Sequence, residues 1–167
     1  MEILETKRLL LRPFTLDDSD FILELLNTEG WIKYIGDRNI KTNEQARNYL
    51  ENGPLKSYQT NGFGLSLVQL KTNNKSIGMC GLIKRDYLDH ADIGFAFLPK
   101  FWAKGYAVES AAAVMNHARE VLALDRVLAI TSPDNEASAK LLGKIGLKFQ
   151  RMMKLSEDAR EVKLFST

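Results

Sequence analysis

The sequence is poor in cysteine and has no long apolar stretch, and both absences limit what the chain can be. Cys80 is the one cysteine among 167 residues, so the chain cannot form an internal disulfide or a cysteine-based metal site. Near the start, Arg8 and Arg12 interrupt a short leucine run, which is unlike a signal sequence or a membrane span. We therefore expect a cytoplasmic protein that uses no metal and binds no membrane.

An excess of charge of one sign is also absent. The 23 Lys and Arg residues nearly balance the 21 Asp and Glu residues, and the net charge is +2. Nucleic-acid-binding domains concentrate basic residues on one face, whereas the charges here are mixed along the chain, so we expect no nucleic-acid partner. Apolar residues make up 45% of the chain, as in globular domains. Its length predicts a single domain over residues 1–167.

Hydrophobic periodicity and capping residues predict a mixed order of strands and helices. We expect helices over 16–26, 43–53, 108–122 and from Asn135 to Gly146, and strands over 9–14, 63–70, 77–83, 93–98, 127–131, 147–155 and 161–165. The aromatic segment Glu29–Asn39 lacks periodicity and is predicted as a loop. A meander followed by a crossover helix predicts an α+β fold, whose mixed, mostly antiparallel twisted sheet is flanked by about four helices.

The stretch FWAKGYAVE, residues 101–109, lies where a strand leads into a helix. A helix N-terminus presents unpaired N–H groups and the positive end of the helix dipole, so it can bind phosphate. Ala103, Gly105 and Ala107 leave room for the backbone to approach an anion, and Lys104 adds positive charge. Alternatively, Gly105 only shapes the turn and the alanines pack the helix on the sheet. A dinucleotide fingerprint is disfavoured because only one glycine is present.

With KGYAVE after the strand IGFAFLP, the sequence resembles the GNAT N-acetyltransferases, and most of all the subgroup that includes the ribosomal-protein N-terminal acetyltransferases of the RimJ and RimL type. The stretches TKRLLLRPFTLDD and SPDNEASAKLLGKIGLK are similar to the family's opening strand and to its Asn-x-x-Ser helix. The likeness covers nearly the whole chain. The sequence departs from the subgroup at Ala103, where glycine is usual, and at Leu147, where phenylalanine is commoner.

The resemblance implies the GNAT acyl-CoA N-acyltransferase fold with splayed central strands, and acetyl-CoA as co-substrate. Backbone groups of the strand Ile93–Leu98 would bind the pantetheine arm, the following loop the pyrophosphate, and Asn135 the pantetheine while also capping its helix. The implied acetyl-CoA-binding residues are Phe95, Phe97, Leu98, Trp102, Ala103, Lys104, Gly105, Tyr106, Ala107, Val108 and Asn135.

Acetyl transfer to an amine needs proton transfers but no covalent enzyme intermediate. By the resemblance Ser138 would lie near the thioester sulfur and protonate the departing thiolate; otherwise it is a small surface residue. Asp92 stands at a strand start, where a carboxylate could be the general base, could hold a water, or could be only solvated or paired; His90 is a neighbouring candidate. Cys80 is expected to be an apolar strand residue, because no partner makes it a nucleophile.

The resemblance places part of the acceptor wall at Trp31 and Tyr34, although these aromatic residues could equally pack between helices. The expected reaction acetylates a primary amine, either a protein N-terminus or a small molecule. The alternative is a non-catalytic acyl-CoA-binding or regulatory module of the same fold. Nothing in the sequence separates a monomer from a homodimer.

Overall fold

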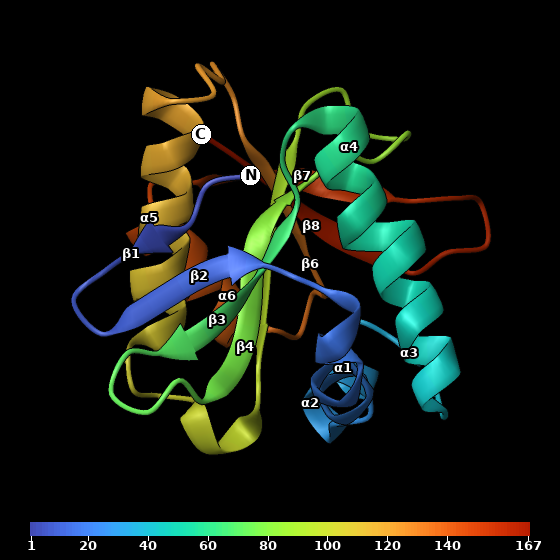
Figure 1. Cartoon of the computed structure of the whole chain (residues 1–167). Helices are drawn as coiled ribbons and strands as arrows, with labels where there is room; N and C mark the ends of the chain where they lie inside the picture. The colour runs from blue at the N-terminus through green and yellow to red at the C-terminus, as the bar shows by residue number, and fades with distance from the viewer.

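The computed structural model describes residues 1–167, and its centre is one eight-stranded sheet (Figure 1). The strands stand in the order β1-β2-β3-β4-β5-β6-β8-β7. Only the β5–β6 pair is parallel, so the prediction of a mixed, mostly antiparallel sheet is confirmed. The strands are β1 (Leu4–Glu5), β2 (Leu9–Pro13), β3 (Leu65–Leu70), β4 (Ser76–Ile83), β5 (Asp92–Phe97), β6 (Leu128–Thr131), β7 (Lys148–Lys154) and β8 (Glu161–Ser166).

Helices cover both faces of the sheet, in two groups (Figure 1). One group follows β2 and precedes β3: α1 (Ser19–Leu26), α2 (Glu29–Tyr34), α3 (Asn43–Leu50) and α4 (Lys56–Asn61). The other group is α5 (Tyr106–Glu120) and α6 (Glu136–Lys144). Short 3₁₀ turns at Leu16–Asp18 and Pro99–Phe101 precede α1 and lie between β5 and α5. No helix is long and apolar enough to cross a bilayer.

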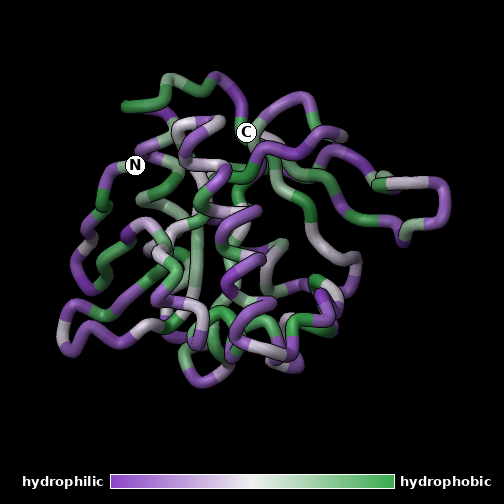
Figure 2. The backbone as a smooth tube through the Cα atoms, turned by 45° about the vertical axis from the view of Figure 1, so that its right-hand side comes forward, coloured by the Kyte–Doolittle hydropathy of each residue, from purple (hydrophilic) through white to green (hydrophobic).

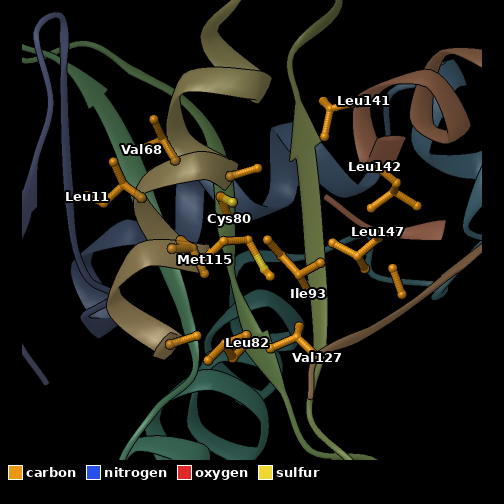
Figure 3. Packing of buried hydrophobic residues seen from close by; sticks show 14 of the residues in the cluster. Leu11, Val68, Cys80, Leu82, Ile93, Met115, Val127, Leu141, Leu142 and Leu147 are labelled. Carbon is orange, nitrogen blue, oxygen red and sulfur yellow. The ribbon is translucent and has the colours of Figure 1, made fainter. Parts of the chain in front are cut away.

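Two apolar clusters, one on each face, hold these layers together. Buried side chains of α5 and α6, such as Met115 and Leu142, pack against Val68, Ile93 and other strand residues (Figure 3). A second cluster joins α1, α2 and α3 to the opposite face. In Figure 2 the hydrophobic colour gathers on the central strands, and the outer loops are mostly hydrophilic. Apolar burial on both faces fixes which side of each strand faces which helix group.

The predicted strands and all four predicted helices are present, but the region between α1 and β3 differs. Residues Glu29–Tyr34 were predicted as loop and form α2, whose N-cap Thr28 accepts a hydrogen bond from the Trp31 N–H. At six residues α2 is too short to display a helical period. The chain also stays helical beyond Gly53, because the π-helical turn Glu51–Leu55 accommodates Pro54 and leads directly into α4.

The parallel pair β5–β6 meets at one end only. Its single bridge joins Asp92 to Leu128, whose N–H donates to the Ala91 carbonyl at 2.9 Å. Beyond this point the two strands separate, while β4 and β8 hold their outer edges. The expected splay of the central strands is therefore present. It opens toward the carboxyl ends of both strands, from which α5 and α6 follow.

Candidate active site

The β5 edge of the splay carries backbone groups that pair with no other strand. The Leu98 N–H donates to Ile77 on β4 at 2.9 Å, which fixes the alternation of this antiparallel ladder. The N–H and C=O groups of Phe95 and Phe97 therefore point to the side where β6 has moved away. One of them is occupied, because Trp102 Nε1 donates to the Phe97 carbonyl at 2.8 Å. Both groups of Phe95 and the N–H of Phe97 remain open.

The β6 edge offers matching groups that the sequence did not reveal. The Leu128 N–H points toward β5, and residues in a strand alternate, so the backbone of Ile130 also faces the splay. Ala129 and Thr131 direct their backbone groups to β8 instead. Finding Ile130 required the register between β5 and β6, for which the sequence carries no signal.

The loop between β5 and α5 presents a continuous run of free amides. The N–H groups of residues 103–108 donate to no backbone or side-chain acceptor. Ala103 and Gly105 both have positive φ, of 56° and 81°, and such left-handed residues turn successive amides to one side of a loop. These amides lie at the N-terminus of the 15-residue helix α5, where the helix dipole favours an anion.

Two predicted members of this set have occupied amides. The Trp102 N–H donates to the Pro99 carbonyl at 3.1 Å. Leu98 is buried, its N–H is bound by β4, and its carbonyl accepts from the Phe101 N–H at 2.9 Å. Leu98 therefore offers a bound molecule no free backbone group. Trp102 contributes its side chain, which holds the end of β5.

A clamp on the far side of the loop was missed from the sequence. The Glu109 carboxylate accepts hydrogen bonds from Thr6 Oγ1 at 2.6 Å, from the Arg8 N–H at 2.9 Å and from Arg8 Nε at 2.6 Å. Arg8 Nη1 also donates to the Lys104 carbonyl at 3.0 Å, and the guanidinium lies over the Tyr106 ring. By holding this carbonyl, Arg8 fixes the conformation of the loop whose amides are free.

The charge of Glu109 is stabilised by the same contacts. Partial burial pushes the pKa of Glu109 upward, but the hydrogen bonds from Thr6 and Arg8 and the Arg8 charge outweigh it, so the pKa is lowered. The clamp is thus an ion pair at neutral pH. Both partners stand inside motifs that carried the family resemblance, TKRLL and KGYAVE, yet only the fold shows that these motifs touch.

Three lysines gather next to this loop. The ammonium groups of Lys75, Lys100 and Lys104 lie 5.9, 5.6 and 5.9 Å from the centre of the Phe101 ring. They come from the β3–β4 turn and from the loop itself. None of the three forms a salt bridge with a carboxylate. The mouth of the site is therefore positively charged, which favours an anionic molecule.

The helix α6 begins on the same side of the sheet as α5. Asn135 caps it, with its Oδ1 atom accepting the Ser138 N–H at 3.1 Å. The cap predicted for Asn135 is confirmed. The Ser138 hydroxyl forms no hydrogen bond within the protein and is half-buried. It is free to contact a bound molecule.

Asp92 lies at the closed end of the splay, in an ion pair. Both of its carboxylate oxygens accept from Arg85 Nε, at 3.0 and 3.1 Å, and the side chain is 1% exposed. Burial raises the pKa of Asp92, although Arg85 opposes the shift. Side chains alternate between the two faces along β5, so Asp92 lies on the same face as Ala96. Ala96 packs in the apolar cluster under α1, α2 and α3, and Asp92 therefore faces the α1–α4 side.

The two predicted acceptor-wall residues occupy different environments on α2. Trp31 is 6% exposed and belongs to the core beneath α1–α3, with no partner for its Nε1. Tyr34 is half-buried, with the Lys33 ammonium 4.8 Å from its ring centre. A Cβ atom placed on Gly30 would lie 2.5 Å from the Trp102 ring. Trp102 thus packs directly on the α2 backbone and links the loop before α5 to the α1–α4 side.

Cys80 is not positioned as a nucleophile. It is fully buried, and burial raises the pKa of its thiol to about 12, so the reactive thiolate is not populated at neutral pH. It packs in the cluster beneath α5 (Figure 3). The site therefore consists of open backbone groups, positive charge and a few hydroxyl and carboxyl groups, without an activated nucleophile.

Known proteins are similar to this chain in sequence and in fold. The model of the acetyltransferase (GNAT) domain family matches residues 8–148. The uncharacterized N-acetyltransferase YoaA of Bacillus subtilis (strain 168) is 29% identical over 154 residues, which cover 91% of this chain and 86% of YoaA. A GNAT-family acetyltransferase from Bacillus anthracis has a crystal structure similar to this one, with a TM-score of 0.81 and 25% identity, covering 99% of this chain and 98% of that chain.

A fold neighbour with lower identity has been solved with a ligand. The structure of RimL, described as a ribosomal L7/L12 alpha-N-protein acetyltransferase in complex with coenzyme A, has a TM-score of 0.82 and 18% identity. It covers 99% of this chain, and this chain covers 97% of it. At this identity the likeness establishes the shared fold.

Proposed function

Because the chain belongs to the acetyltransferase (GNAT) domain family and is an acetyl-CoA-dependent acetyltransferase, we propose that it is of the RimJ/RimL-like type and acetylates a primary amine by direct attack. The acceptor is either a protein N-terminus or a small-molecule amine. Acetyl-CoA supplies the acetyl group as an activated thioester.

One observation carries the proposal: the open amides of residues 103–108 adjoin the splay between β5 and β6. The amides fit the pyrophosphate of coenzyme A, because they lie together at a helix N-terminus beside unpaired lysines. The splay fits the amide-containing pantetheine arm, because Phe95, Phe97 and Ile130 present open donors and acceptors along it. Asn135 lies beside this arm and keeps α6 in place.

The residues that we assign to the chemistry lie on opposite faces of the sheet. Ser138, in the first turn of α6, would donate its hydroxyl proton to the sulfur as the carbon–sulfur bond breaks. Asp92, on the α1–α4 face, would accept the proton of the incoming amine, directly or through a water. A raised pKa suits a carboxylate for this task. Its ion pair with Arg85 gives the carboxylate a fixed orientation.

The absence of an activated nucleophile supports direct attack. Cys80 is buried and protonated, so no acyl-enzyme intermediate forms on it. The amine would approach from the α1–α4 face, past Tyr34 and the edge of Trp31, while the α5–α6 face holds acetyl-CoA. Trp102 connects the two faces, because its ring packs on Gly30 of α2 and its Nε1 atom donates a hydrogen bond to the Phe97 carbonyl of β5.

Calorimetry and a thiol-release assay test this function. We expect saturable binding of acetyl-CoA and none of NAD, and release of free coenzyme A when peptides with free N-termini or small amines are added. A Cys80→Ala variant should retain the activity. Binding of NAD without acetyl-CoA would refute the proposal. Binding of acetyl-CoA without transfer to any member of a broad amine panel would favour the alternative, a non-catalytic acyl-CoA-binding module.

A further inference from the structure

Thr131, the last residue of β6, has a buried hydroxyl group without a partner. The residue is 8% exposed, and its Oγ1 atom is one of two buried side-chain polar atoms that form no hydrogen bond in the whole chain. The other, Trp31 Nε1, lies in the core under α1–α3. Buried hydroxyl groups in native proteins are nearly always paired, so this group needs an explanation.

The strand register places Thr131 at the splay. The β5–β6 bridge pairs Asp92 with Leu128, and in a parallel ladder the pairing advances residue by residue. Continued along both strands, it sets Thr131 level with Phe95. Phe95, with its open N–H and C=O groups, and Thr131 therefore stand at the same height on the two strands that border the splay.

Side-chain alternation also sets the direction of the hydroxyl. Thr131 is in step with Ala129, which packs in the core beneath α5 and α6, so its side chain lies on the α5–α6 face. Its own backbone is paired with Lys163 on β8. The hydroxyl is thus the one group of Thr131 left for a molecule in the splay, on the face from which acetyl-CoA enters.

We propose that the Thr131 hydroxyl is a further contact for the acyl-pantetheine arm, donating a hydrogen bond to a carbonyl oxygen. This inference rests on the proposed binding of acetyl-CoA in the splay. Two carbonyl groups could be the acceptor: a pantetheine amide or the thioester itself. An amide contact acts on binding alone, whereas a thioester contact strengthens as negative charge develops on the oxygen and therefore acts on turnover.

The pair Thr131→Val and Thr131→Ser tests the contact. Valine has the same shape but lacks the unpaired hydroxyl, so we expect the ligand-free protein to melt about 1 to 3 °C higher. Its affinity for acetyl-CoA, measured by calorimetry, should fall about tenfold, or ~1.4 kcal/mol. Thr131→Ser keeps the hydroxyl and should bind like the parent. A Thr131→Val variant that melts at a higher temperature but binds acetyl-CoA more weakly identifies the hydroxyl as a ligand contact, because losing a structural contact would lower the melting temperature.

The outcomes separate this inference from the proposed function. A parent protein that does not bind acetyl-CoA refutes both. If the parent binds and Thr131→Val binds equally well, the inference is wrong and the proposed function stands. If Thr131→Val does not fold, the hydroxyl has a structural role and the inference is also wrong. A fall in kcat in addition to the lost affinity identifies the thioester carbonyl, and an unchanged kcat identifies a pantetheine amide.

Discussion

Replacing Ala103 by glycine should stabilise the protein, although glycine usually weakens ordered structure. Ala103 has a φ of 56°, in the left-handed region that costs an L-residue about 1–2 kcal/mol. Glycine removes this cost but adds freedom to the unfolded chain, which costs about 0.4–1 kcal/mol. The net gain is about 0.5–1 kcal/mol, or about 1 to 4 °C in melting temperature for a chain of this length.

Ala123 provides a matched control for this substitution. It has a φ of 52° and is exposed after α5, away from the splay. Ala123→Gly should therefore give a similar rise in melting temperature by scanning calorimetry. Neither variant should lower kcat/KM by more than about twofold, because the loop conformation is kept. If Ala103→Gly melts below the parent while Ala123→Gly melts above it, relief of backbone strain does not control the stability at Ala103.

Three further substitutions test the loop and the chemistry. Glu109→Gln breaks the clamp to Arg8 and should raise KM for acetyl-CoA severalfold with little change in kcat. The pKa of Glu109 is lowered in the folded protein, so its charge stabilises the fold at pH values above its unfolded pKa of about 4.3, and this stabilisation is lost as the pH falls. Glu109→Gln should therefore make the free energy of unfolding depend less steeply on pH in the acid range. An unchanged pH dependence would contradict the clamp. Gly105→Val should raise the KM for acetyl-CoA far more than the control Gly62→Val, because Gly62 also has a positive φ but a side chain placed there would meet no other atom. Equal KM values would assign Gly105 to folding alone. Ser138→Ala should lower kcat ~10²-fold with unchanged acetyl-CoA affinity by calorimetry, and parental turnover would make Ser138 a bystander.

The sequence predicted most of the fold because most elements carry their own local signal. The hairpin β3–β4, the strand β5 and the helices α5 and α6 follow from periodicity, turns and caps. The prediction of a loop at α2 was wrong because six residues with one buried side chain, Trp31, show no period. The helix α4 was missed because Gly53 and Pro54 normally end a helix, and a π-helical turn is a tertiary outcome that they do not signal.

The site was predictable only where it is local in the sequence. The amides of residues 103–108 belong to one contiguous loop, and small residues with a helix start suffice to indicate them. The clamp joins Arg8 to Glu109, which are 101 residues apart, and the Ile130 edge depends on a register between two strands separated by a helix. Both contacts form only when distant segments pack together, and the spacing of residues in the sequence does not predict them.

The alternation of β5 explains how one strand can serve both substrates. Its odd-numbered residues, such as Phe95 and Phe97, direct their side chains to the α5–α6 core and their open backbone groups into the splay. Its even-numbered residues, Asp92 and Ala96, face the α1–α4 side. A molecule held along the β5 edge is therefore reached from the opposite face through the opening that β6 leaves. In the proposed reaction the acceptor amine and acetyl-CoA enter from different faces, so that both can be bound at once, as direct transfer without an enzyme-bound intermediate demands.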